Sequence, residues 1–152
     1  MEATTLARSA GDTLSIGDIR TEWGWVKPAI EEILEANPHL TYIPEDVYAE
    51  VKSGHAVLWI ADKAFAVTTS ETDQFSGEKT LLVWVCWSQP NGTSVLFRHL
   101  EELTQVAAGS GYSWIETRTQ NARLGEALGH WDWELDHIVY RRSCHVFKTK
   151  AV

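Results

Sequence analysis

The residues of this chain best suited to chemistry lie in one short turn, Gln89-Pro-Asn-Gly-Thr-Ser94. The turn follows an apolar run at residues 81–87, which predicts a buried strand, and it precedes an amphipathic run at 95–103, which predicts a helix. A helix that opens at such a turn directs unpaired backbone N–H groups and its positive end toward one point. That arrangement suits an anion such as a phosphate.

The residues inside the turn allow two interpretations. Gly92 lets the backbone approach a ligand closely, and Thr93 or Ser94 can cap the helix. Asn91-Gly92 is also among the commonest turn dipeptides, so the same residues fit an ordinary strand-to-helix connection.

The elements before the turn are predicted from periodicity and from helix-end signals. Apolar periodicity predicts a helix that begins at Glu22 and ends at Asn37-Pro38. A second helix is expected to begin at Pro44, because proline favours the first helical turn, and to end before Gly54, because glycine favours the position after the last turn. Residues 55–61 and 64–69 read as strands joined at hairpin spacing, and a third strand is expected at 80–87.

The elements after the turn complete an α/β (α+β) pattern. The helix that follows the turn ends at Gly109-Ser-Gly111, and we expect a strand at 112–117, a helix at 121–128 and a final pair of strands at 131–147. A helix crossing from strand 80–87 to strand 112–117 predicts a parallel pair in the middle of a mostly antiparallel sheet. Residues 1–21 are expected to form an arm or a first strand, and 22–152 a single domain.

This element order, together with Gln89-x-x-Gly92-x-Ser94, resembles the GNAT superfamily of acyl-CoA-dependent N-acetyltransferases. The turn is similar to the Gln/Arg-x-x-Gly-x-Gly/Ala pyrophosphate loop of that family, and the resemblance covers about residues 22–147. It implies a GNAT-like fold, with helices on both faces of the sheet and acetyl-CoA as cofactor. The implied pyrophosphate-binding residues are Gln89, Asn91, Gly92, Thr93 and Ser94.

The resemblance also implies roles for residues outside the turn. The backbone of Val83, Trp84 and Val85 would bond the pantetheine arm, as the corresponding strand does in the family. Asn121 matches the start of a second family landmark, Asn-x-x-Ala…Tyr-x-x-Leu-Gly-Phe, and Leu128-Gly129 matches its end. The tyrosine of that landmark, which often protonates the departing thiolate, falls on Gly125, so this acid is missing.

The sequence does not identify the general base of such a reaction either. Attack by an amine on a thioester needs a carboxylate, a histidine or a water relay within hydrogen-bond reach. Residues 81–87 contain no carboxylate, and Glu116 on the next strand is the best-placed one. A solvated residue, or a partner for a nearby arginine, is the alternative interpretation of Glu116. The further candidates are His55, His99 and His130.

Composition limits the partners of the chain. The formal charge of −8 argues against nucleic acid and suits a cationic amine or a protein partner. No apolar run has the roughly 20 residues of a membrane-spanning helix, and no signal peptide, transmembrane segment or metal-ligand spacing is evident. We therefore expect no membrane association, no metal and a cytoplasmic location, or a virion if the protein is of phage type.

The eight tryptophans require a heavily aromatic core or an exposed aromatic patch. Trp84 and Trp87 are three residues apart on a predicted strand, so their side chains should point to opposite faces.

The sequence is compatible with two functions. The first is an acyl-CoA-dependent N-acyltransferase that transfers an acetyl group to an amine of a small molecule or a protein, which the retained turn favours. The second is a catalytically inactive GNAT-fold binding or structural module, for example a phage virion or host-interaction protein. The missing acid and base favour the second, and fold alone does not separate the two.

Overall fold

The computed structural model describes residues 13–89 and 93–145, with the side chains of 93–95 outside the description. The chain divides into two compact units, one ending at Arg118 and the other beginning at Thr119.

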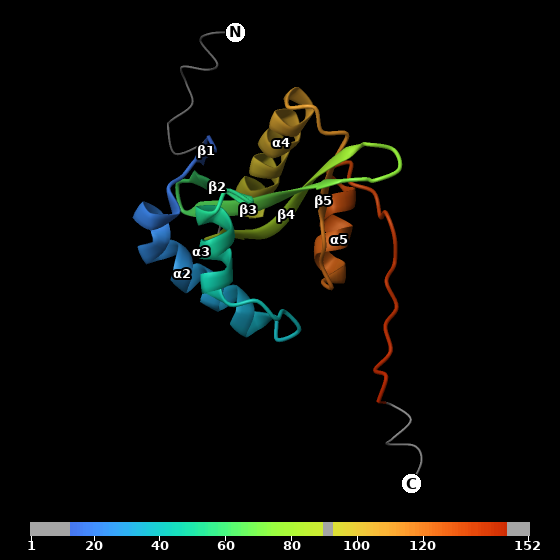
Figure 1. The fold of residues 1–152 in the computed structure, drawn as a ribbon, viewed down its shortest axis with the longest axis horizontal. Coiled ribbons are helices and arrows are strands. Elements are labelled where there is room, and N and C mark those ends of the chain that lie inside the picture. Colours follow the sequence, from blue (N-terminus) through green and yellow to red (C-terminus); the bar gives the residue numbers. More distant parts are fainter. Residues whose placement is uncertain (1–12, 90–92, 146–152) are drawn as a thin grey trace. The chain divides into compact units, whose positions relative to one another are not determined.

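The first unit is built on a five-stranded sheet in the order β1 (Ser15–Ile16), β2 (Ala56–Ala61), β3 (Ala64–Thr72), β4 (Lys79–Ser88) and β5 (Trp114–Thr117). Neighbouring strands are antiparallel except β4 and β5, which are parallel. Figure 1 shows the helix that connects these two strands. The predicted hairpin between β2 and β3 and the predicted parallel pair are both confirmed.

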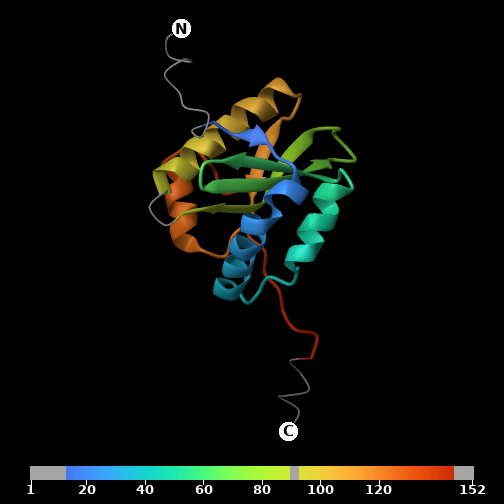
Figure 2. The same cartoon turned by 90° about the vertical axis from the view of Figure 1, so that its left-hand side faces the viewer.

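Helices cover both faces of this sheet, as predicted (Figures 1 and 2). One face carries α2 (Ile19–Ala36) and α3 (Pro44–Lys52), and the other carries α4 (Thr93–Gly109). Helix α2 starts three residues earlier than expected, because the Asp18 side chain accepts a hydrogen bond from the Arg20 backbone N–H and caps the helix there.

The main core lies between the sheet and the pair α2 and α3. Its members are buried aliphatic residues around one aromatic ring: Ile19, Val26, Ala29, Ile30, Val47, Ala56, Leu58, Phe65, Val67 and Val85. Leu100 and Leu103 of α4, and Leu81 and Val83 of β4, are buried outside that cluster. Strand β4 is therefore covered on both faces.

The second unit contains α5 (Ala122–Gly129) and an irregular stretch after it. The expected final strands are wrong for the described part of that stretch, since residues 131–145 form no strand. A strand needs a neighbour for its backbone N–H and C=O groups and a cover for its apolar face. Leu135, Ile138, Val139 and Tyr140 have the composition of a strand, but all four side chains are exposed.

Within the described ranges, no helix has both the length and the apolar character needed to cross a membrane.

Candidate functional site

Strand β4 contains a β-bulge at Trp84. Val67 of β3 pairs with Val85, whereas the next residue, Thr68, pairs with Val83, so Trp84 is an extra residue in β4 without its own partner in β3. A bulge of this kind bends its strand and increases the local twist. The strand therefore changes direction at one of the residues predicted to contact the cofactor.

The same region is where β4 loses its second neighbour. The parallel ladder with β5 ends at the pair Val83 and Thr117, while β4 continues to Ser88. Among the described residues, 85–88 therefore have a strand partner on the β3 side only, and the bulged Trp84 has a strand partner on neither side. The backbone of such an open edge can hydrogen-bond an extended, amide-containing ligand as a neighbouring strand would.

The bulge also changes the direction of the tryptophans. Trp84 and Trp87 both pack against the cluster under α2 and α3, so the prediction that they occupy opposite faces is wrong. The ring centroid of Trp84 lies 5.3 Å from that of Tyr42, and the centroid of Trp87 lies 6.4 Å from that of Trp25. Simple alternation fails because the inserted residue shifts the pleat between these two positions.

Tyr42 is a further candidate for the site, and nothing in the sequence alone pointed to it. It lies between α2 and α3, its ring packs on Trp84, and burial raises the pKa of its hydroxyl, with the Cys86 thiol as a second cause. The phenol therefore stays protonated at neutral pH and can donate a hydrogen bond or a proton next to the bulge. No local motif marks this residue, because its contact with Trp84 joins segments that lie far apart in the sequence.

The predicted pyrophosphate turn is described only at its two ends. The backbone N–H of Gln89 donates to the carbonyl of Lys63 at 3.1 Å, which ties the start of the turn to the β2–β3 hairpin. Thr93 and Ser94 are the first two residues of α4, where backbone N–H groups have no partner inside the helix. Asn91 and Gly92 lie outside the described residues.

Glu116 lies on β5, in register with Leu82 of β4. Its carboxylate accepts a hydrogen bond from Arg118 Nε at 3.3 Å, and the same guanidinium bonds Glu71 at 3.1 Å. The side chain is 24% exposed. Glu116 thus stands on the strand next to the bulge, but its carboxylate is shared with an arginine.

The other candidate residues have local contacts of their own. His55 is exposed beside Ser53, and buried His99 bonds Glu102 through Nδ1 at 2.9 Å. In the second unit, Asn121 accepts from the Arg123 backbone N–H as the N-cap of α5, and His130 follows the end of that helix. Among the described residues, the buried Nε2 of His99 has no hydrogen-bond partner, so the contact with Glu102 accounts for only one nitrogen of that ring.

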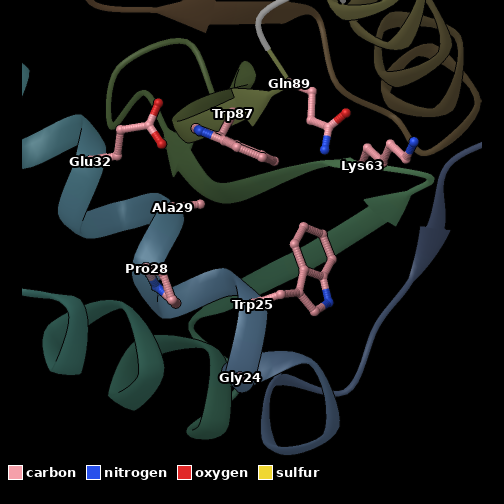
Figure 3. A pocket seen from close by; sticks show the side chains of 8 residues that line it. All are labelled: Gly24, Trp25, Pro28, Ala29, Glu32, Lys63, Trp87 and Gln89. Carbon is pink, nitrogen blue, oxygen red and sulfur yellow. The ribbon is translucent and has the colours of Figure 1, made fainter.

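A cavity of about 540 Å³ lies on the α2 side of the end of β4 (Figure 3). It is lined by residues from α2, from the β2–β3 turn and from the end of β4: Gly24, Trp25, Pro28, Ala29, Glu32, Lys63, Trp87 and Gln89. Two of them, Trp87 and Gln89, belong to the segment that contains the open edge and the start of the turn. No pattern in the sequence predicts this cavity, since its lining comes from three separate segments of the chain.

Known proteins resemble this chain in structure and not in sequence. No family model matches the sequence, and no curated protein matches it significantly. A probable acetyltransferase has a TM-score of 0.68 and 12% identity over 86% of this chain and 95% of its own. An acetyltransferase of Trypanosoma brucei has a TM-score of 0.65 and 9% identity over 86% and 97%.

A third similar structure was solved with a bound cofactor. It is the aminoglycoside N-acetyltransferase AAC(6')-Iy in complex with CoA, with a TM-score of 0.59 and 13% identity over 86% of this chain and 99% of its own. The fold of this chain is that of the GNAT-type acetyltransferases, as the resemblance in the turn and the element order implied.

Proposed function

We propose that this protein binds an acyl-CoA at the open edge of β4 and transfers the acyl group to an amine. The observation that carries this proposal is the bulge at Trp84 on a strand that continues five residues beyond its last pairing with β5, up to a turn that opens a helix. The fold supports the same function, since a solved N-acetyltransferase with this architecture contains CoA.

The residues present fit the chemical groups of such a cofactor. The pantetheine arm carries amides, which can bond to the backbone of Trp84 and Val85, where β4 has no neighbour on the β5 side. Val83, the remaining predicted contact, is the last residue of β4 that pairs with β5. The pyrophosphate is an anion, which suits the N–H groups at the start of α4, where Thr93 and Ser94 lie. The cofactor supplies the activated acyl group as a thioester.

The chain itself must hold the amine and move two protons. Glu116 is the candidate base, because it lies on β5 beside the last β4–β5 pairs. Tyr42 is the candidate acid, because its protonated hydroxyl belongs to a ring packed on the bulged Trp84. In this scheme Tyr42 replaces the family acid that is absent at Gly125.

Thermal denaturation with acetyl-CoA tests the binding step. A ligand at 100 times its Kd stabilises the native state by about 2.7 kcal/mol. For a chain of this size, about 2–4 °C of Tm corresponds to each kcal/mol, so the expected rise is roughly 5–10 °C. An unchanged Tm at millimolar acetyl-CoA contradicts the proposal.

Two glycine variants make that test specific. Gly92→Val should abolish the acetyl-CoA shift, since a branched side chain obstructs the approach of the phosphates to the turn. Gly109→Val, at the end of α4, is the matched control, because an added Cβ there meets nothing within 4 Å. Loss of the shift in both variants would show that the effect is not local to the turn.

Release of free CoA thiol in the presence of an amine panel tests the transfer step. Turnover supports the acyltransferase. A clear thermal shift without turnover on any amine would instead describe a cofactor-binding module that does not catalyse transfer.

A further inference from the structure

The cavity beside Trp87 is a separate feature from the open edge of β4, and it has the size of a small-molecule site. Its volume of about 540 Å³ falls within the roughly 300–1,000 Å³ typical of ligand pockets. Its lining combines apolar surface with one acidic and one basic side chain.

The apolar lining includes two indole rings, Trp25 and Trp87, that the core holds in place. Phe65, which is 2% exposed, lies with its ring centroid 5.7 Å from Trp25 and 6.2 Å from Trp87. The indole N–H of Trp25 also donates to Glu22, which restrains that ring further. Both rings are therefore positioned before any ligand arrives, which lowers the entropic cost of binding.

The acidic and the basic side chain of the cavity lie on opposite sides of Trp87 (Figure 3). In Figure 3, Glu32 extends from α2 on one side of Trp87, and Lys63 and Gln89 lie on the other side. Within the described part of the chain, neither Glu32 nor Lys63 has an ion-pair partner. Each charge is thus available to a ligand of opposite sign.

We propose that this cavity binds a small, elongated zwitterion with an amine at one end, a carboxylate at the other and an apolar or aromatic body between them. The amine pairs with Glu32, the carboxylate with Lys63 and the Gln89 amide, and the body packs on Trp25 and Trp87. Cations also interact favourably with indole faces, which adds to recognition of the amine end.

The role of this ligand follows from the position of the cavity. Trp87 and Gln89 belong to the same strand end as the open edge, so a ligand here lies beside the proposed acyl-CoA site. We infer that the ligand is the acyl acceptor, and this role rests on the proposed function. Binding of the zwitterion to the cavity does not depend on it.

Calorimetric titration of the full chain without acetyl-CoA tests the cavity directly. The probe is 4-(aminomethyl)benzoate, compared with benzylamine, which lacks the carboxylate, and with benzoate, which lacks the amine. The zwitterion should bind at least fivefold more tightly than either. Equal affinity for the three compounds, or no binding at millimolar concentration, overturns the proposal.

Charge-removing variants assign the two ends. Glu32→Gln should weaken binding of the zwitterion and of benzylamine at least fivefold and leave binding of benzoate unaffected. Lys63→Met should weaken binding of the zwitterion and of benzoate at least fivefold and leave binding of benzylamine unaffected. The controls are Glu31→Gln and Lys52→Met, which remove the same charges from exposed positions outside the lining. If the controls weaken binding as much, the effect is one of overall charge and the site is refuted.

The outcome can be separated from that of the acyl-CoA proposal. If the zwitterion does not bind while acetyl-CoA still raises the Tm, the cavity assignment fails alone. If the zwitterion binds while acetyl-CoA has no effect, the cavity is a ligand site and its role as acceptor site fails. Appearance of the N-acetylated probe supports both proposals.

Discussion

Replacing Phe65 by alanine tests whether this buried ring stabilises the core and holds the two indoles of the cavity wall in place. The ring is 2% exposed, belongs to the main buried cluster, and contacts both indoles that form the cavity wall. A buried Phe→Ala change typically costs about 3–5 kcal/mol, from lost transfer free energy plus the cavity left behind. At about 2–4 °C per kcal/mol, the expected fall in Tm is roughly 6–20 °C.

The same variant should also weaken the ligand site, because both indoles lose the ring that restrains them. Circular dichroism melting measures the stability, and the titration with 4-(aminomethyl)benzoate measures the site. Phe75→Ala is the matched control, since that ring is 89% exposed, and its effect should stay within about 0.5 kcal/mol. If Phe65→Ala melts within 2 °C of the parent (about 1 kcal/mol or less), the packing argument for this core is refuted.

Three further predictions concern other parts of the chain. Burial raises the pKa of the Cys86 thiol to about 11. A thiol reagent at pH 8 should therefore react rapidly with the exposed Cys144 and not with Cys86. Fast modification of both thiols in the native protein would contradict this prediction. If Glu116 is the base, Glu116→Gln should lower turnover at least tenfold, and unchanged turnover removes it from the mechanism. Two backbone N–H groups of the β3–β4 loop donate hydrogen bonds to the Asp73 carboxylate and hold its pKa below the usual value. These hydrogen bonds therefore stabilise the loop at pH values above about 4. The stabilisation is lost as the pH falls through the lowered pKa. The protection factors of those two amides, which are corrected for the slower intrinsic exchange at low pH, should then fall on acidification, while those of neighbouring exposed amides stay unchanged.

Most of the element order could be predicted because it depends on local signals. Pro44 begins α3 as predicted, Gly54 follows that helix with a φ of +86°, and the Asp62-Lys63 pair turns the β2–β3 hairpin. Each of these signals acts within a few residues, through fixed backbone angles or turn geometry. The stretch 131–145 carries strand-type residues too, but a strand also needs a partner, which composition does not specify.

The candidate site could be predicted only where it depends on consecutive residues. The turn from Gln89 to Ser94 is recognisable because a strand, a glycine and a helix start follow one another along the chain. The bulge at Trp84 was not predictable, since it is a mismatch in pairing between β3 and β4. The relative direction of Trp84 and Trp87 depends on that mismatch, and the contact of Tyr42 with Trp84 joins two segments far apart in the chain.

The sequence by itself determined the succession of helices and strands as far as α5, because this succession follows from periodicity, proline, glycine and helix-end chemistry. Only the tertiary structure decided where β4 separates from β5, which face receives Trp84 and Trp87, and that Glu32 and Lys63 line one cavity. The physical reason is that register, bulges and cavities are set by contacts between segments far apart in the chain, and their energies depend on packing that no single segment contains.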